Sequence, residues 1–153
     1  MYDLEDLYQE IILDHNKNPR NARKIEPCTH TAEGYNPLCG DEVTVYLNLK
    51  DGKIEDVSFT GEGCAISKAS ASLMTTVVKG LSLDALAQQS AKVQELLTGD
   101  AKEEDTSLDA LGDLAALSGV RRFPARIKCA TLPWHALEAA LKGTSQISTE
   151  HET

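Results

Sequence analysis

The sequence predicts an α+β fold in which a small antiparallel sheet packs against helices, and two observations support this prediction. Between residues 43 and 60, apolar residues alternate with polar ones on both sides of Asp51-Gly52, as in a β-hairpin with a two-residue turn. In most of the remaining chain, apolar residues recur every three or four positions, as in amphipathic helices. A chain of 153 residues suits one domain. We assign it to residues 1–143 and expect a polar, flexible tail over 144–153.

Composition and charge exclude several classes of function. The chain is 41% hydrophobic and 25% charged, as globular proteins are, and no apolar run approaches the roughly 20 residues of a membrane-spanning helix. A net charge of −9 argues against nucleic-acid binding as the principal role. Because the N-terminus is acidic where an export signal would be basic, we expect a cytoplasmic protein. We also expect a monomer. Its four cysteines should then stay reduced, which favours thiolate chemistry or metal binding over disulfides.

The first helix and the hairpin have clear boundaries in the sequence. Helical spacing of apolar residues starts after Asp3 and stops before Pro19. His15 lies near the end of this helix, where an imidazole suits the helix dipole, so we predict a structural role for it. In the second strand of the hairpin the alternation slips between Ile54 and Val57, which indicates either a bulge or a late start to strand pairing.

The segment from Cys28 to Tyr35 reads as extended and carries a cysteine and a histidine two positions apart. The spacing of Cys28 and His30 would allow a metal pair. However, neither residue lies on a glycine-bearing turn, and no third ligand is near them in the sequence. We therefore predict that both are structural.

Four helices are predicted after the hairpin. Apolar spacing indicates helices over Ile66–Val78 and Leu83–Leu97, then a short helix over Leu108–Leu117 that ends at Gly119. The last helix is predicted to begin at Pro133, because proline suits the first turn of a helix. Its inner face would carry Trp134, and Gly143 would end it.

Three of the cysteines lie at boundaries between predicted secondary-structure elements. Cys39 lies on a Pro/Gly-bearing turn, Cys64 precedes a helix, and Cys129 lies shortly before the last predicted helix. A helix N-terminus would favour the thiolate form at the last two. With Asp41 the set becomes three sulfur atoms and one oxygen, which suits tetrahedral zinc. The spacing alone does not decide between a metal site and three unrelated buried cysteines that pack as small hydrophobic residues.

Three motifs add a resemblance to a known family. They are NPLCGD at residues 36–41, GEGCAISKASAS at 61–72 and FPARIKC at 123–129. In this order and spacing they resemble the SufU branch of the IscU-like iron–sulfur cluster assembly proteins, and the similarity extends over nearly the whole chain. The resemblance implies an IscU-like fold with about three antiparallel strands, in which the segment from Thr29 to Tyr35 supplies the third.

The resemblance also implies a function and a ligand set. It implies a zinc-dependent sulfurtransferase that takes persulfide sulfur from a SufS-type, PLP-dependent cysteine desulfurase and works with other iron–sulfur assembly proteins. The implied zinc ligands are Cys39, Asp41, Cys64 and Cys129. Our hypothesis is that the partner displaces Cys39 from the metal and that Cys39 then accepts the sulfur. Arg126 and Lys128 are candidates for contact with the persulfide or the partner.

Two other functions remain open on the sequence. Three thiolates and a carboxylate could hold a transient [2Fe–2S] cluster, as on a scaffold protein. Against that, the scaffold branch carries a histidine where this chain has Lys128, and the insertion over residues 99–119 resembles SufU. The other alternative is a structural zinc domain that serves only protein–protein interaction.

Overall fold

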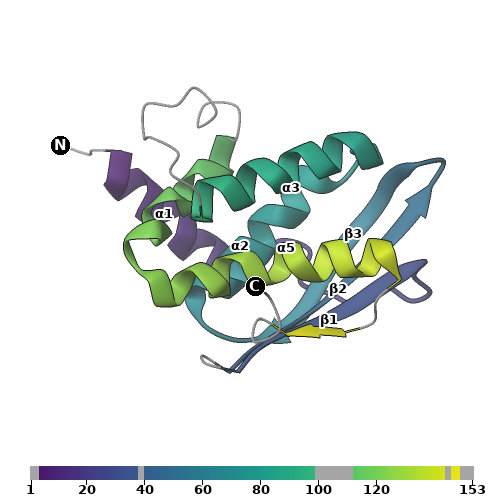
Figure 1. The fold of residues 1–153 in the computed structure, drawn as a ribbon, viewed down its shortest axis with the longest axis horizontal. Coiled ribbons are helices and arrows are strands. Elements are labelled where there is room, and N and C mark those ends of the chain that lie inside the picture. Colours follow the sequence, from purple (N-terminus) through teal and green to yellow (C-terminus); the bar gives the residue numbers. More distant parts are fainter. Residues whose placement is uncertain (1–3, 38–39, 99–111, 144–145, 149–153) are drawn as a thin grey trace.

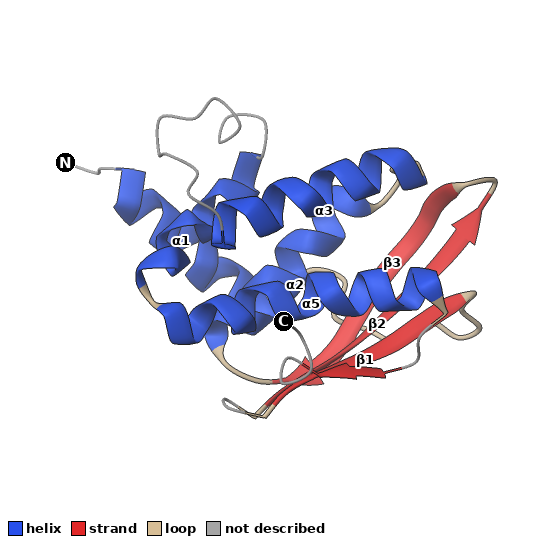
Figure 2. Ribbon diagram, in the orientation of Figure 1, coloured by secondary structure: helices blue, strands red, loops and turns tan. Residues whose placement is uncertain are grey.

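The computed structural model describes residues 4–37, 40–98, 112–143 and 146–148 of the chain. Figure 2 shows the helices gathered on one face of a twisted sheet, which confirms the predicted α+β fold. None of the helices in the described ranges is long and apolar enough to cross a membrane.

The sheet contains three antiparallel strands and a short fourth one. β1 (His30–Asn36) pairs with β2 (Asp41–Lys50), and β2 pairs with β3 (Lys53–Glu62), as predicted. β4 (Gln146–Ser148) lies parallel to β1 at the other edge, so the strand order is β3-β2-β1-β4. The prediction of a flexible tail over 144–153 therefore missed this strand. The other residues of that tail lie outside the described ranges.

The hairpin follows the predicted local chemistry. Asp51 and Gly52 have φ angles of 53° and 75°, the left-handed conformation that a tight two-residue turn between twisted strands requires. The strand register shifts beyond Asn48, which faces Asp56 while Leu49 faces Ile54, so Glu55 is the extra residue. Of the two predicted explanations for the break in alternation, the structure therefore shows the bulge.

The helices form two layers above the sheet. α5 (Pro124–Lys142) packs on β1 and β2, and α2 (Ala65–Val78) packs on β3 and beside α5 (Figure 1). The outer elements are α1 (Leu4–Lys17), α3 (Leu83–Thr98) and the 3₁₀ helix η1 (Gly112–Arg122). These bounds confirm the predicted first helix and the two helices after the hairpin.

Two predicted boundaries were wrong. α5 begins at Pro124 and not at Pro133, which lies inside the helix. Pro133 has no backbone N–H, so the carbonyl four residues earlier lacks its usual helical hydrogen bond. Beside this missing hydrogen bond, the Ser70 hydroxyl of α2 donates to the Ala130 carbonyl at 2.6 Å. The short helix was expected to end at Gly119, but η1 continues through it. Gly143 ends α5 in the left-handed conformation, as predicted.

The core lies between the sheet and the two inner helices. The inward side chains of β2 and the inner face of α5 are fully buried, among them Val45, Leu47, Trp134 and Leu137. His15 is also buried, and its Nδ1 lies 2.7 Å from the Ser72 hydroxyl of α2. This contact ties α1 to the inner layer and agrees with the structural role predicted for His15.

Candidate metal centre

The candidate site lies at one end of the sheet. β1 ends at Asn36, β2 begins at Asp41, and β3 ends at Glu62, two residues before Cys64. Because neighbouring strands run antiparallel, the end of β1, the start of β2 and the end of β3 lie at the same end of the sheet. α5 crosses above them and contributes Cys129.

Three of the four predicted ligands meet here. One ligand atom from each of Asp41, Cys64 and Cys129 lies within 4.8 Å of the others. Asp41 and Cys129 are fully buried, and Cys64 is half-buried. We call these three residues the donor cluster. The fourth predicted ligand, Cys39, lies outside the described residues.

The Asp41 carboxylate is oriented by its neighbours. Its Oδ1 accepts the backbone N–H of Cys64 at 2.7 Å, and its Oδ2 lies 3.8 Å from Cys64 Sγ. Oδ2 also accepts a hydrogen bond from Asn36 Nδ2 at 3.3 Å. One oxygen is thus used to hold the start of α2, and the other faces the sulfur atoms.

Cys64 has the predicted place at a helix N-terminus. It is the N-cap of α2, and its Sγ accepts the backbone N–H of Ser67 at 3.5 Å. The unpaired N–H groups of a first helical turn carry partial positive charge and stabilise an anionic sulfur. The predicted position of Cys64 at the N-terminus of a helix is therefore confirmed.

The corresponding prediction for Cys129 was wrong. Cys129 lies in the second turn of α5, with its Sγ 4.0 Å from the Ala125 carbonyl oxygen. The influence of the helix dipole falls off within the first turn. Its sulfur instead receives a hydrogen bond from Asn36 Nδ2 at 3.5 Å. Asn36 was part of a quoted motif, but we predicted no role for it.

Glycine at position 63 allows the end of β3 to approach Asp41 closely. A Cβ added to Gly63 would lie 2.5 Å from Asp41 Oδ1 and 3.1 Å from its Cα. Gly61 is similarly restricted, because it has a φ of 144° and an added Cβ would lie 2.1 Å from the Glu42 carbonyl oxygen. Glycine at positions 61 and 63 therefore lets the end of β3 lie close against the start of β2, which carries Asp41.

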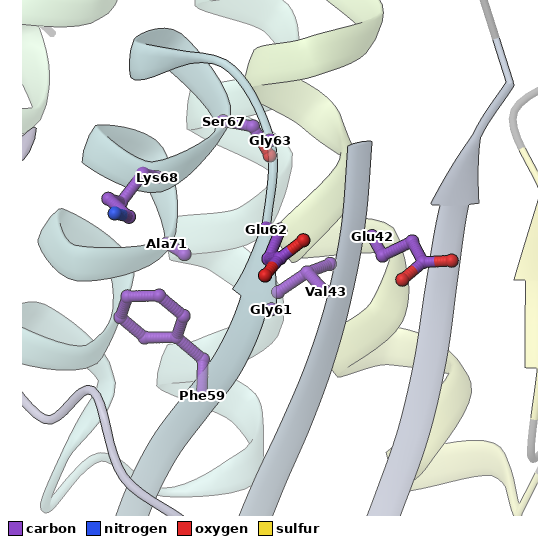
Figure 3. Close-up of a pocket in the computed structure, with 9 residues that line it drawn as sticks. All are labelled: Glu42, Val43, Phe59, Gly61, Glu62, Gly63, Ser67, Lys68 and Ala71. Carbon is purple, nitrogen blue, oxygen red and sulfur yellow. The ribbon is translucent and has the colours of Figure 1, made fainter. Parts of the chain in front are cut away.

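The surroundings of the cluster carry charge of both signs. A small pocket beside it is lined by Gly63 and Ser67 together with Glu42, Glu62 and Lys68 (Figure 3). Glu42 and Glu62 face each other across β2 and β3 and are exposed. Two like charges directly opposite one another are unfavourable for the sheet by themselves, and they place negative potential beside the donors.

The remaining predicted site residues are not among the three residues of the donor cluster. Arg126 and Lys128 are exposed on the first two turns of α5. Cys28 and His30 do not join a group of potential metal ligands within the described part of the chain. The His30 Nδ1 instead lies 2.9 Å from the neighbouring Thr29 hydroxyl.

The donor cluster fits zinc. Zinc takes thiolate and carboxylate ligands at about 2.3 and 2.1 Å in tetrahedral sites, where ligand atoms stand about 3.8 Å apart at most. The present separations, within 4.8 Å, need only a small contraction to reach that geometry. Two sulfur atoms and one oxygen leave one tetrahedral position for a fourth ligand.

Comparisons with known proteins show which family the chain resembles. A family model described as the NifU-like N terminal domain matches residues 7–142. The zinc-dependent sulfurtransferase SufU of Bacillus subtilis is 46% identical over 135 residues, which cover 88% of this chain and 89% of that protein. The iron–sulfur cluster assembly scaffold protein IscU of Streptococcus pyogenes is 37% identical over 139 residues, covering 91% and 85%.

Solved structures show the same fold. One is a protein from Fervidobacterium islandicum described as an iron–sulfur cluster assembly scaffold for the SUF system. It matches with a TM-score of 0.79 at 35% identity and covers 91% of this chain and 99% of that one. A NifU-like N-terminal protein from Brucella abortus has the same TM-score at 24% identity, which supports the fold alone.

Proposed function

The chain belongs to the family of NifU-like N-terminal domains, and from this premise we propose that it is a zinc-dependent sulfur-transfer protein of iron–sulfur cluster assembly. Its sulfur would come from a cysteine desulfurase of the SufS type. The observation that carries this proposal is the meeting of Asp41, Cys64 and Cys129, three potential ligands far apart in the sequence. The 46% identity to a zinc-dependent sulfurtransferase supports it.

In this proposal the donor cluster and Cys39 hold the metal. When bound, zinc keeps thiols deprotonated at neutral pH without leaving them open to oxidation. Asp41 supplies a harder oxygen ligand among sulfur atoms. The two cysteines of the cluster are anchored in helices, Cys64 as the N-cap of α2 and Cys129 inside α5.

Cys39 is the proposed sulfur acceptor, because the other two cysteines are fixed by the fold. Cys129 is fully buried, and the Cys64 sulfur is held by the Ser67 N–H. In the sequence, Cys39 lies between Asn36, where β1 ends, and Asp41, where β2 begins. Its thiolate would attack the outer sulfur of a cysteine persulfide on the desulfurase. A new S–S bond forms on Cys39, the persulfide S–S bond breaks, and the partner's thiolate leaves, so no outside oxidant is needed.

The start of α5 is the proposed contact with the partner. Arg126 and Lys128 are exposed cations in a chain with a net charge of −9, and both are close in sequence to Cys129. Phe123, at the N-cap of the same helix, is 61% exposed. A basic surface with an exposed aromatic side chain suits an acidic partner surface and can also balance the negative charge of a persulfide.

A scaffold function is the second candidate, because the IscU relatives carry that name. The same donors could hold a [2Fe–2S] cluster. The residue before Cys129 is Lys128, whose side chain is exposed and which is not part of the donor cluster. This chain would therefore have to hold a cluster without a ligand at that position.

One experiment tests the proposal. The zinc-loaded protein is incubated with a SufS-type desulfurase and cysteine, alkylated, and mapped by mass spectrometry. We expect added sulfur on Cys39, faster desulfurase turnover with the wild type, and loss of both in Cys39→Ser. Cys28→Ser is the matched control and should behave as the wild type. Sulfur on Cys64 or Cys129 would contradict the role of Cys39.

The metal content of the same preparation separates the two candidates. Tightly bound zinc without visible absorption is expected for the sulfur-transfer protein. A purified protein that contains iron and sulfide and shows cluster absorption would favour the scaffold function instead.

A further inference from the structure

We infer that Asn36 is a positioning residue of the metal centre, whose side-chain amide holds Asp41 and Cys129 in place for the metal. The inference rests on the proposed zinc site and adds a residue that is not itself a ligand. It follows from the place of Asn36 in the sheet, its two contacts and the chemistry of an amide donor.

Asn36 occupies an inward position at the end of β1. In this strand the buried positions alternate through Ala32, Gly34 and Asn36, so the last side chain points to the helical layer. Asn36 is the strand partner of Asp41 and is fully buried. A buried amide is costly unless its hydrogen-bonding groups have partners, and both contacts below are made to proposed ligands.

One nitrogen atom joins two ligands from different parts of the fold. Asn36 Nδ2 lies 3.3 Å from Asp41 Oδ2 and 3.5 Å from Cys129 Sγ. An amide nitrogen carries two hydrogen atoms and can donate to both acceptors at once. Asp41 belongs to β2 and Cys129 to α5, so the amide links the sheet to the helix above it at the metal site.

The amide is suited to this task because it is a neutral donor. Hydrogen bonds to a carboxylate and a thiolate stabilise their negative charge and set their orientation. A lysine or arginine here would add a positive charge that competes with a metal cation. An aspartate here would add a negative charge next to the Asp41 carboxylate and the Cys129 sulfur. Loss of a residue that orients metal ligands typically weakens metal binding by about 10- to 100-fold.

The test compares Asn36→Leu, which keeps the approximate size but cannot donate, with the wild type. Zinc affinity is measured by competition with a chromophoric chelator, and release is followed after adding excess chelator. We expect weaker binding by about 10- to 100-fold and faster release. In cobalt-substituted protein, the d–d and thiolate charge-transfer bands should change, which a loss of global stability alone would not cause.

Asn48→Leu is the matched control. Asn48 lies near the other end of β2, about 23 Å from Asp41 along the strand, and its side chain accepts the Thr29 backbone N–H. The control loses an asparagine hydrogen bond without touching the donor cluster. It should keep the zinc affinity and the cobalt spectrum of the wild type.

A second variant covers the case in which Asn36→Leu does not fold. Asn36→Ser keeps one hydroxyl donor for two acceptors, and we expect a smaller loss of affinity with an altered cobalt spectrum. Wild-type zinc affinity and spectrum in the folded variants would overturn the inference alone. A wild-type protein that binds no zinc would overturn the proposed function, and the role of Asn36 with it.

Discussion

Substitution of Gly63 by alanine tests whether the metal centre depends on the close approach of the β3 end to Asp41. The added methyl group would lie 2.5 Å from Asp41 Oδ1, whereas ordinary contacts begin at 3.4 Å. Either the carboxylate or the backbone must therefore move by about 1 Å in a close-packed interior. The backbone of Gly63 does not have the left-handed conformation, so this clash is the main effect of the substitution.

The size of the effect follows from the bond that this shift would break. Asp41 Oδ1 accepts the Cys64 N–H at 2.7 Å, and a displacement of about 1 Å removes it from hydrogen-bonding range. A hydrogen bond to a charged group contributes about 1.5–3 kcal/mol. We expect Gly63→Ala to lower the free energy of unfolding by that amount and to weaken zinc binding by about 10- to 100-fold.

The assay uses two independent readouts. Urea unfolding of the zinc-free protein, followed by the fluorescence of Trp134, gives the change in stability. Competition with a chromophoric chelator gives the change in zinc affinity. Gly119→Ala is the matched control, because a Cβ added to Gly119 meets no atom within 4 Å. It should leave both quantities unchanged.

One result would refute the reasoning about Gly63. If Gly63→Ala binds zinc as tightly as the wild type and unfolds at the same urea concentration, the approach of β3 to Asp41 is not required for the site. A loss of stability without any loss of affinity would show that the clash is relieved by the backbone and does not reach the carboxylate.

Two further predictions concern stability away from the metal. Burial raises the pKa of Asp56, but the hydrogen bonds from Arg23 and the Val57 N–H, together with the positive charges of Arg23 and Lys79, outweigh burial and hold the pKa below its usual 3.8. Arg23→Gln should therefore lower the free energy of unfolding by less than about 1 kcal/mol at neutral pH. In urea titrations this difference from the wild type should disappear as the pH falls through the pKa of Asp56 in the folded protein. A difference that stays constant down to pH 2 would contradict this. Ser72→Ala removes the hydroxyl that contacts His15 Nδ1 and accepts the Arg20 backbone N–H. It should lower the free energy of unfolding by about 1–3 kcal/mol and leave the zinc affinity unchanged. Unfolding at the same urea concentration as the wild type would refute this prediction.

The hairpin was predictable from the sequence because its signals are local. The inward residues of β2 from Val43 to Leu47 form one apolar face, and the pattern of alternation is enough to orient each side chain. The turn needs two residues that tolerate a positive φ, and Asp51-Gly52 supplies them. The bulge at Glu55 is visible as a break in the same alternation.

The start of α5 was not predictable in this way, because the deciding contact is distant in sequence. Pro124 and Pro133 both suit the first turn of a helix. Pro133 is accommodated inside the helix, and the hydroxyl of Ser70 on α2 bonds to the Ala130 carbonyl beside it. Local signals cannot reveal such a partner, and the position of Cys129 relative to the helix end was misjudged for this reason.

The site could be predicted only in part. Residue types and the family resemblance pointed to Asp41, Cys64 and Cys129, but sequence spacing alone did not show that they meet. Their proximity depends on the antiparallel order of the strands and on the path of α5 above the sheet. Asn36 did have a local signal, since the alternation in β1 places it inward beside Asp41. The Asn36 amide is not itself a metal-binding side chain, so a prediction based on metal-ligand residue types leaves it out.

The separate origins of Asp41, Cys64 and Cys129 have a thermodynamic consequence. They come from β2, α2 and α5, so a metal ion held by all three would connect three segments that are far apart in the sequence. Because these residues come together only in the folded chain, metal binding would stabilise the folded state over the unfolded one. Free zinc at 1,000 times the Kd would add about 4 kcal/mol to the free energy of unfolding. Metal supply would then control the lifetime of the folded protein as well as its chemistry, and metal depletion would expose it to proteolysis.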